Sequence, residues 1–261
     1  MQIITTLRDT KLGLGKDGQV IAPAGFVSGL HGSQFYHPSP TMCSLYDDFN
    51  GDSVDAQWDA KTGSNGSVVT PTVNSQASGV VRLTTGAGTS SMAVNGVQLH
   101  RFLTWKASPG HLAMECRLNL SAITNMAVFV GFTDQVASLE MPINSASSAD
   151  TITTTATDAA GFMFDTAMTT TKWWLTGVAN DTDGTHISSG TAPVAATFQV
   201  LRVQLDTAGN ATYWINGTQV GQVALAVTPT VLLTPFVGGF TRTTAAQNID
   251  VDYIFTNMTR V

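Results

Sequence analysis

The chain has 261 residues, a formal net charge of −6 at pH 7 and only 11% charged residues. That charged share is well below the roughly 25% of ordinary soluble domains. Because the sequence also lacks a Lys/Arg cluster, we expect no nucleic-acid partner. No apolar segment approaches the roughly 18 residues of a membrane span, so we expect no membrane partner. The neutral, Thr-rich surface suits β-structure and burial against other protein subunits.

The first 42 residues differ from the rest and predict an extended arm. Glycines recur from Gly13 to Gly32 between short apolar pairs, and His37–Pro40 closes the segment as a linker. A Gly-rich terminal segment frays unless its own domain or a neighbouring subunit ties it down. No basic region followed by an apolar run is visible, so we expect no signal peptide. The predicted domains are therefore an arm and linker over residues 1–42 and a β-domain over residues 43–261.

Short segments with strand patterns follow one another from Leu45 onward. Residues 125–132 form a nearly continuous apolar run, whose brevity favours a buried strand over a helix. Residues 145–160 are rich in Ser, Thr, Ala and Asp and predict a long surface loop with room for one helical turn. Alternation over residues 111–118 puts four apolar side chains on one face, namely Leu112, Met114, Cys116 and Leu118. Further strands are predicted at residues 79–84, 97–103, 161–165, 172–178 and 231–240.

Residues 197–223 predict three strands joined by two tight turns. Apolar and polar residues alternate over 201–206 and again over 211–215, the period of strands with one buried face. Residues 207–210 supply turn chemistry between these two strands. Asn216–Gly217 then predicts a two-residue type I′ hairpin turn, which needs a positive φ at both positions.

A closing strand is predicted over residues 249–256. Simple alternation places Ile249, Val251, Tyr253 and Phe255 on one face and Asp250 and Asp252 on the other. With the segments above, this makes about a dozen short strands and no long amphipathic helix, a pattern typical of an antiparallel sandwich. The predicted fold class is all-β, a two-sheet antiparallel jelly-roll sandwich preceded by the Gly-rich arm.

The order of the strands resembles the concanavalin A-like (laminin G-like) jelly roll over residues 45–261. The points of likeness are Asp48–Gly51 with Trp58, a middle strand Met114–Leu118 leading to Val130–Asp134, the segment Leu205–Gly217, and a closing Ile249–Tyr253. In that family one sheet is concave and binds glycans or carries the carboxylates of glycosidases. Many bacteriophage virion proteins use the same fold without an enzymatic role, and the charge-poor composition and Gly-rich arm look like that group.

The hydrolases of the family that this sequence resembles place their carboxylates in a Glu-x-Asp-x-Glu run on one strand. This sequence contains no such run. Hydrolysis of a glycosidic bond needs two carboxylates flanking that bond. Glu115 and Glu140 are the only glutamates, and Glu115 is expected alone on the face opposite the core. Asp250 and Asp252 share a face but lie on the final strand. We therefore predict no catalytic residues and a chain that is not an enzyme.

No metal or cofactor is predicted. The five histidines have no zinc-site spacing, and the sequence has no Gly-x-Ser-x-Gly elbow. Cys43 and Cys116 make neither a disulfide framework nor a metal-ligand pattern. Asn180, Asp181 and Asp183 offer the hard oxygen ligands that Ca²⁺ takes, but a plain Asx turn explains the same residues.

Three tryptophans are candidate glycan or subunit contacts. Trp173 and Trp174 are adjacent, so on a strand they point to opposite faces, one of them into the core. The outward one is available to stack on a sugar ring or to sit in a subunit contact. Trp214 is in a similar position, opposed to Tyr213.

These observations lead to the hypothesis of a non-enzymatic structural protein of a virus particle, a decoration (cement) protein on the outer surface of a phage capsid. Its partners would be the major capsid protein and copies of itself, for example in a trimer. The arm would pair its backbone with a sheet edge of another subunit. Its apolar side chains would fill pockets there: Ile3, Ile4, Leu7, Leu12, Leu14 and Phe26.

The alternative is a carbohydrate-binding module of a phage tail or head fibre, which uses an exposed tryptophan as its platform. A third hypothesis, an enzyme of the glucanase type, lacks the family's carboxylate run.

Overall fold

The computed structural model describes residues 13–14, 20–21, 41–70, 79–88, 90–147 and 150–261. The chain divides into two compact units, Met1–Ser39 and Pro40–Val261. In the first unit, β1 (Gly13–Leu14) pairs antiparallel with β2 (Val20–Ile21). The predicted arm contact Leu14 lies in β1, and the boundary after residue 42 stays a prediction. The other predicted arm contacts lie outside the described residues: Ile3, Ile4, Leu7, Leu12 and Phe26.

The second unit is built from β-strands and a single-turn helix, α1 (Met92–Asn95). Its strands are β3 (Met42–Asp47), β4 (Asp59–Thr62), β5 (Val68–Thr70), β6 (Val81–Thr84), β7 (Val97–His100), β8 (Leu112–Leu120), β9 (Met126–Thr133), β10 (Ile143–Ser147), β11 (Thr151–Thr154), β12 (Ala159–Asp165), β13 (Trp174–Ala179), β14 (Thr182–Asp183), β15 (Ile187–Ser188), β16 (Gln199–Leu205), β17 (Ala211–Ile215), β18 (Thr218–Val223), β19 (Thr234–Thr241) and β20 (Asn248–Thr259).

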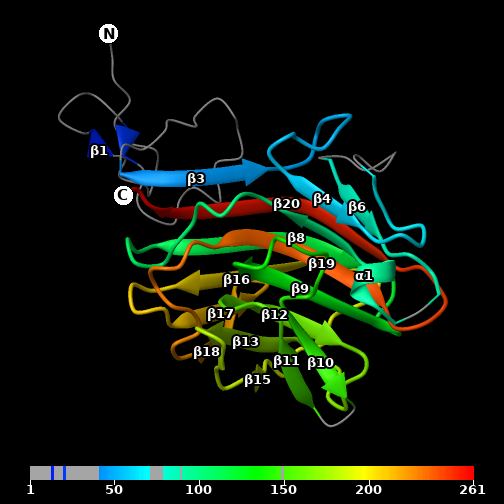
Figure 1. Ribbon diagram of the computed structural model, residues 1–261. Coiled ribbons are helices and arrows are strands. Elements are labelled where there is room, and N and C mark those ends of the chain that lie inside the picture. Colours follow the sequence, from blue (N-terminus) through cyan, green and yellow to red (C-terminus); the bar gives the residue numbers. More distant parts are fainter. Residues whose placement is uncertain (1–12, 15–19, 22–40, 71–78, 89, 148–149) are drawn as a thin grey trace. The chain divides into compact units, whose positions relative to one another are not determined.

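Two eight-stranded antiparallel sheets form a sandwich (Figure 1). One, which we call the β8 sheet, has the order β18-β17-β16-β8-β20-β6-β5, with β3 also paired to β20. The other, the β9 sheet, has the order β14-β13-β12-β9-β19-β7-β4, with β15 also paired to β13. Strands distant in sequence are neighbours in both sheets, as β8 and β20 are. The predicted fold class, an all-β two-sheet antiparallel jelly-roll sandwich, is confirmed.

The alternation predicted for β8 places its apolar side chains on the inner face of the β8 sheet. Its apolar side chains are buried in one core cluster with those of β9, while Glu115 and Arg117 stay half-buried on the outer face. Burial raises the pKa of the Cys116 thiol well above its ordinary value. The core members from β8 and β9 are Leu112, Met114, Cys116, Leu118, Leu120, Met126, Val128, Val130 and Phe132.

Two hairpins close with a positive φ at both turn residues, and the sequence predicts this type I′ turn at one of them, Asn216–Gly217. Asn216 and Gly217, between β17 and β18, have φ values of 50° and 79°. Asn180 and Asp181, between β13 and β14, have φ values of 50° and 58°. Asn and Asp tolerate this left-handed region because their short side chains hydrogen-bond locally, and positive φ at both positions defines the type I′ turn.

The prediction for the closing strand is wrong in its second half. The pairing of β20 with β8 shifts register between Val251 and Tyr253. A β-bulge adds one residue to a strand and so reverses the facing of every residue after it. Ile249 and Val251 are core residues as expected, but Ile254 takes the next core position. Tyr253 and Phe255 are therefore half-buried on the outer face.

The prediction of a loop over residues 145–160 is also wrong. The segment contains part of β10, all of β11 and the beginning of β12. β10 and β11 form an antiparallel hairpin, and Asp150 just before β11 has a φ of 55°. The Thr-rich composition that looked like a loop also favours strands, because β-branched residues fit the pleated backbone.

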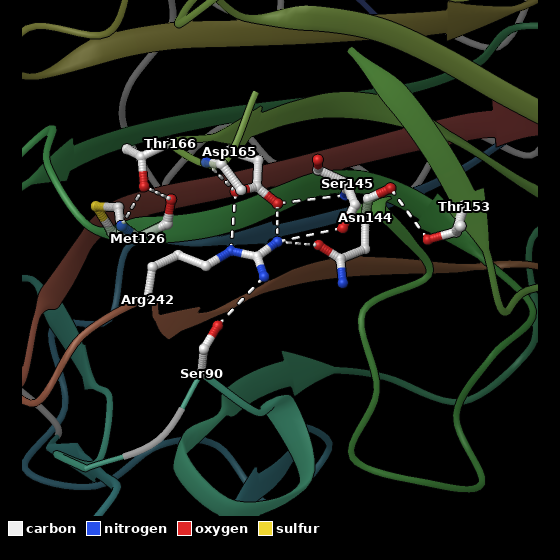
Figure 2. A network of polar contacts seen from close by, with 9 residues as sticks. Ser90, Met126, Asn144, Ser145, Thr153, Asp165, Thr166 and Arg242 are labelled. Atoms are coloured by element: carbon white, nitrogen blue, oxygen red, sulfur yellow. Dashed lines mark hydrogen bonds and ion pairs between the residues drawn. The ribbon is translucent and has the colours of Figure 1, made fainter. Parts of the chain in front are cut away.

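An ion pair ties this hairpin to the β9 sheet (Figure 2). Asp165, at the end of β12, is 0% exposed, and both of its oxygens accept hydrogen bonds from the Arg242 guanidinium, one of them at 2.9 Å. The same guanidinium donates to Asn144 Oδ1 at 2.8 Å and to Ser90 Oγ at 3.2 Å. The backbone N–H of Ser145 also donates to Asp165, at 3.3 Å. One arginine thus joins β10, β12 and the segment before α1.

Arg242→Met should destabilise the fold strongly. The substitution leaves the buried Asp165 carboxylate without its counter-ion, a loss that costs about 3–5 kcal/mol. Arg82→Met is the matched control, since Arg82 and Asp250 are 34% and 13% exposed and such pairs contribute at most about 1 kcal/mol. Urea unfolding of the two variants measures the difference. Equal losses in both would show that the buried pair has no special role.

Candidate functional site

One row of residues crosses five strands on the outer face of the β8 sheet. Trp214 on β17 lies opposite Arg202 on β16, and Arg202 lies opposite Glu115 on β8. Glu115 lies opposite Phe255 on β20, and Phe255 lies opposite Tyr46 on β3. Side chains at directly opposite positions of one sheet face interact. We call this strip the Trp214–Tyr46 row.

Glu115 is held by a hydroxyl group from the neighbouring strand. Tyr253 Oη donates a hydrogen bond of 2.8 Å to Glu115 Oε1. Burial, followed by this bond to the Glu115 carboxylate, raises the pKa of Tyr253 far above its ordinary value, so the phenol stays a donor. Among the described residues nothing donates to Oε2, the second oxygen of Glu115. That oxygen is available to an incoming donor.

Arg202 turns toward Trp214 and away from its cross-strand partner Glu115. Its guanidinium carbon lies 5.4 Å from the Trp214 ring centroid, and Nη2 donates to Gln204 Oε1 at 3.3 Å. Its Nε is buried without an acceptor. In the described part of the chain no carboxylate lies within ion-pair distance of this arginine.

A hollow opens where these two side chains part. It has a volume of about 240 Å³ and is lined by Glu115, Val200, Arg202, Trp214 and Gly217. Drug-sized sites occupy about 300–1,000 Å³, so this hollow suits one small ring unit of a larger ligand. Its wall offers a donor fork, a carboxylate and an indole face.

Four other charged residues on this sheet face are paired with one another. Arg117 makes an ion pair with Asp252, and its guanidinium carbon lies 4.2 Å from the centroid of the Phe198 ring. Further along the same face Arg82 binds both oxygens of Asp250, at 2.6 and 2.8 Å. These pairs add no excess of either charge to this face.

Tyr46 ends the row on the far side. It is 44% exposed, and its ring centroid lies 6.0 Å from that of Tyr253. Burial first, and then the carboxylates of Asp48 and Asp252, raise the pKa of Tyr46. The two tyrosines continue an aromatic surface from Glu115 to the edge strand β3.

The three tryptophans singled out from the sequence do not come together. Trp214 lies in the row. Trp173 is fully buried, and its Nε1 donates to Gln199 Oε1 at 3.2 Å. Trp174 is half-buried, packs on the outer side of the β9 sheet and donates to the Thr170 carbonyl at 3.0 Å.

Sequence reasoning missed Arg202, Tyr46 and Tyr253 as members of a site. Arg202 is one polar residue in an alternating strand, and nothing local shows that its carboxylate neighbour bonds elsewhere. Simple alternation placed Tyr253 on the same face as Ile249 and Val251, because the bulge in β20 leaves no mark in a pattern of alternation. The missing signal was the cross-strand register, which joins residues more than two hundred positions apart.

The other candidate constellations are occupied by local contacts. Asp250 and Asp252 each pair with an arginine, as described above. Asn180 and Asp181 form the type I′ turn, and Asp183 Oδ1 accepts a hydrogen bond from Thr154 at 3.0 Å. Among the described residues no group of three or more His, Cys, Asp or Glu side chains is arranged to hold a metal ion. Nor does any helix in the described ranges have the length and apolar character of a membrane span.

Comparison with solved structures gives matches over most of the chain. The Bacillus licheniformis β-glucanase has a TM-score of 0.55 at 12% identity, covering 82% of this chain and 97% of that one. A β-1,3-1,4-glucanase (lichenase) from a mouse hindgut metagenome has a TM-score of 0.56 at 11% identity, with coverages of 82% and 98%. A laminarinase from Flavobacterium sp. UMI-01 has a TM-score of 0.53 at 9% identity, with coverages of 81% and 98%.

The fold is the concanavalin A-like jelly roll. This confirms the resemblance stated from the sequence, as far as the fold is concerned. No protein-family model matches the chain, and no curated protein matches it in sequence.

Two predictions are contradicted by these matches. The chain was predicted to be a non-enzymatic capsid decoration protein, and to lack enzymatic activity. The three matches described above are named as two glucanases and a laminarinase, and none of the three is named as a virion protein. The phage setting of the fibre alternative lacks support for the same reason. At this low identity the matches show the fold, so the activity has to be argued from residues.

A histidine–aspartate pair lies on the β9 sheet. His100 Nε2 lies 3.6 Å from Asp59 Oδ2, and its Nδ1 lies 3.0 Å from the Arg101 carbonyl oxygen. Burial lowers the pKa of His100. In the described residues no Ser, Thr or Cys side chain bonds to this histidine, so the pair does not extend to a nucleophile.

The free energy of unfolding should fall as the pH drops below about 6.5, the ordinary pKa of histidine. Burial lowers the pKa of both His100 and His186 in the folded state. The unfolded chain therefore takes up protons first as the pH falls, and folding loses stability across that window. His186→Leu should flatten the curve between pH 7 and 5, measured by urea unfolding. The control His111→Asn removes an exposed histidine, and an equal flattening there would contradict the assignment to buried groups.

Proposed function

We propose that the chain is a carbohydrate-active enzyme that binds a polysaccharide along the Trp214–Tyr46 row and uses Glu115 to transfer a proton at a glycosidic bond. The observation that carries the proposal is the hollow, which is lined by Glu115, by Trp214 and by Arg202, an arginine with no ion-pair partner among the described residues. Aromatic faces stack on the apolar faces of sugar rings, and charged side chains bind their hydroxyl groups. The fold neighbours, two glucanases and a laminarinase, support this substrate class.

Glu115 is suited to proton transfer by its surroundings. Tyr253 fixes the carboxylate through Oε1 and leaves Oε2 for the ligand. In glycoside hydrolysis one carboxylic acid protonates the leaving oxygen as the bond to the sugar breaks, and a second carboxylate assists the attacking water or attacks directly. Asp252, adjacent to Tyr253 on β20, supplies a second carboxylate on this face. Arg117 holds it in place.

The chemistry differs from the Glu-x-Asp-x-Glu arrangement of the hydrolases that the sequence resembles. There, alternate residues of one strand supply the carboxylates. Here Glu115 comes from β8 and Asp252 from the bulge of β20, so two neighbouring strands supply one each. Glycosidases are recognised by two carboxylates on either side of the bond, which does not require a single strand.

Mixed-linkage β-1,3-1,4-glucan and laminarin should release reducing ends when incubated with the full chain. Glu115→Gln should lower the rate by about 10²-fold or more, because general acid–base catalysis contributes about 10²–10⁴-fold. Glu140→Gln is the matched control, since it changes the only other glutamate. Glu140 accepts a hydrogen bond of 2.7 Å from Gln135 and does not line the hollow. Its rate should stay within about twofold of the parent.

Two outcomes would refute the proposal. One is the absence of reducing ends from these glucans and from a wider set of polysaccharides that includes mucin glycans. The other is equal loss in the two glutamine variants with unchanged thermal melting, which would mean that Glu115 has no specific role.

A further inference from the structure

The Trp214–Tyr46 row has a direction and a length that single out one kind of ligand. It passes through directly opposed residues of β17, β16, β8, β20 and β3, so it runs perpendicular to the strands. Adjacent strands lie about 4.8 Å apart, and the four intervals between Trp214 and Tyr46 therefore span roughly 19 Å. The hollow at one end holds a single ring, whereas the whole row is several rings long.

Aromatic side chains mark both ends of the row, and a third aromatic side chain lies beside its middle. Trp214 lines the hollow, Tyr46 is 44% exposed at the opposite end, and Tyr253 lies between Glu115 and Tyr46. Flat faces at intervals suit a chain of rings, because each ring can stack while the links between them cross the polar gaps. A compact ligand would contact only one of these faces.

The charges on this face favour a ligand without charge. Arg117 is paired with Asp252 and Arg82 with Asp250, so neither sign is in excess along the neighbouring strands. The hollow itself is lined by one basic and one acidic residue, Arg202 and Glu115. An anionic sugar would gain from Arg202 and lose against Glu115.

Neutral vicinal hydroxyl groups fit the same two residues. One hydroxyl can accept a hydrogen bond from Arg202, and its neighbour can donate to Glu115 Oε2. The Arg202 guanidinium would then gain an acceptor in addition to Gln204, and Glu115 Oε2 would gain a donor that it lacks among the described residues.

We infer that the ligand of this surface is an extended neutral oligosaccharide that lies across the five strands, with one sugar ring in the hollow at Trp214 and its far end on Tyr46. The inference rests on the proposed function and specifies its substrate class. It makes Trp214 the anchor for every ligand length and Tyr46 a contact that only longer chains reach.

The experiment measures binding of neutral gluco-oligosaccharides of increasing length to the full chain by isothermal titration calorimetry. β-1,3-linked and mixed-linkage series serve as probes, with oligogalacturonates as the anionic comparison. Affinity should rise with length until the ligand spans the row and then level off. It should change little with salt, because a neutral ligand forms no ion pairs to be screened.

Two variants locate the ends of the ligand. Trp214→Ala should weaken all lengths by roughly two- to tenfold, the range that the loss of one aromatic contact gives. Tyr46→Ala should weaken only the long oligosaccharides and reduce them to the affinity of the short ones. Phe102→Ala is the matched control, because Phe102 is a 72% exposed aromatic residue on the loop after β7, outside the row. Thermal melting confirms that all three variants remain folded.

The outcomes separate this inference from the proposed function. Length-dependent binding without hydrolysis would support the oligosaccharide and refute the enzyme. Hydrolysis together with binding that is independent of ligand length, or unaffected by Tyr46→Ala, would support the proposed enzymatic function. It would refute the inference that the ligand extends along the Trp214–Tyr46 row. Tighter binding of oligogalacturonates would overturn the neutral substrate class. If no sugar binds and sedimentation shows a dimer that Trp214→Ala dissociates, the face is an interface between copies of this chain and the inference fails.

Discussion

The burial of one face of β8 is the constraint on which the rest of the outer surface depends. Leu112, Met114, Cys116 and Leu118 are fixed in the core between the sheets, so the residues between them must face outward. Strands on both sides of β8 obey the same rule and are locked to it by backbone hydrogen bonds. The side chains of the row therefore line up because the core allows each strand a single register, and a slip of one residue would bury every one of them.

The bulge in β20 is the second feature that determines the outer surface of the β8 sheet, and it interrupts the simple alternation of inward and outward side chains along that strand. Without the extra residue at Asp252, alternation would send Tyr253 into the core and leave Glu115 without its donor. With it, Asp252 and Tyr253 both reach the outer face, where one binds Arg117 and the other binds Glu115. Bulges commonly re-aim side chains next to functional sites. Here a single inserted residue supplies both the second carboxylate and the hydroxyl group that orients the first.

Local chemistry made much of the fold predictable, and long-range pairing made the site unpredictable. The type I′ turn at Asn216–Gly217 and the buried run of β9 depend on residues close in sequence, so they could be read directly. The β10–β11 hairpin was missed because its Thr-rich composition suits loops and strands alike. Glu115 was correctly expected on the outer face, but its meeting with Tyr253 depends on a register shift 138 residues away. No periodicity within either strand contains that information.

Arg202 and Glu115 lie opposite each other without forming an ion pair, and this distinguishes the surface from an ordinary solvent-exposed sheet face. Directly opposed residues of opposite charge normally pair and neutralise each other, as Arg82 and Asp250 do on the same sheet. Here each member bonds elsewhere, Glu115 to a phenol and Arg202 to an indole face and an amide. The alternative contacts hold the two charges apart and keep both partly unsatisfied. A ligand that bridges them gains interactions that the free protein forgoes, which is the energetic basis for binding at a preorganised polar site.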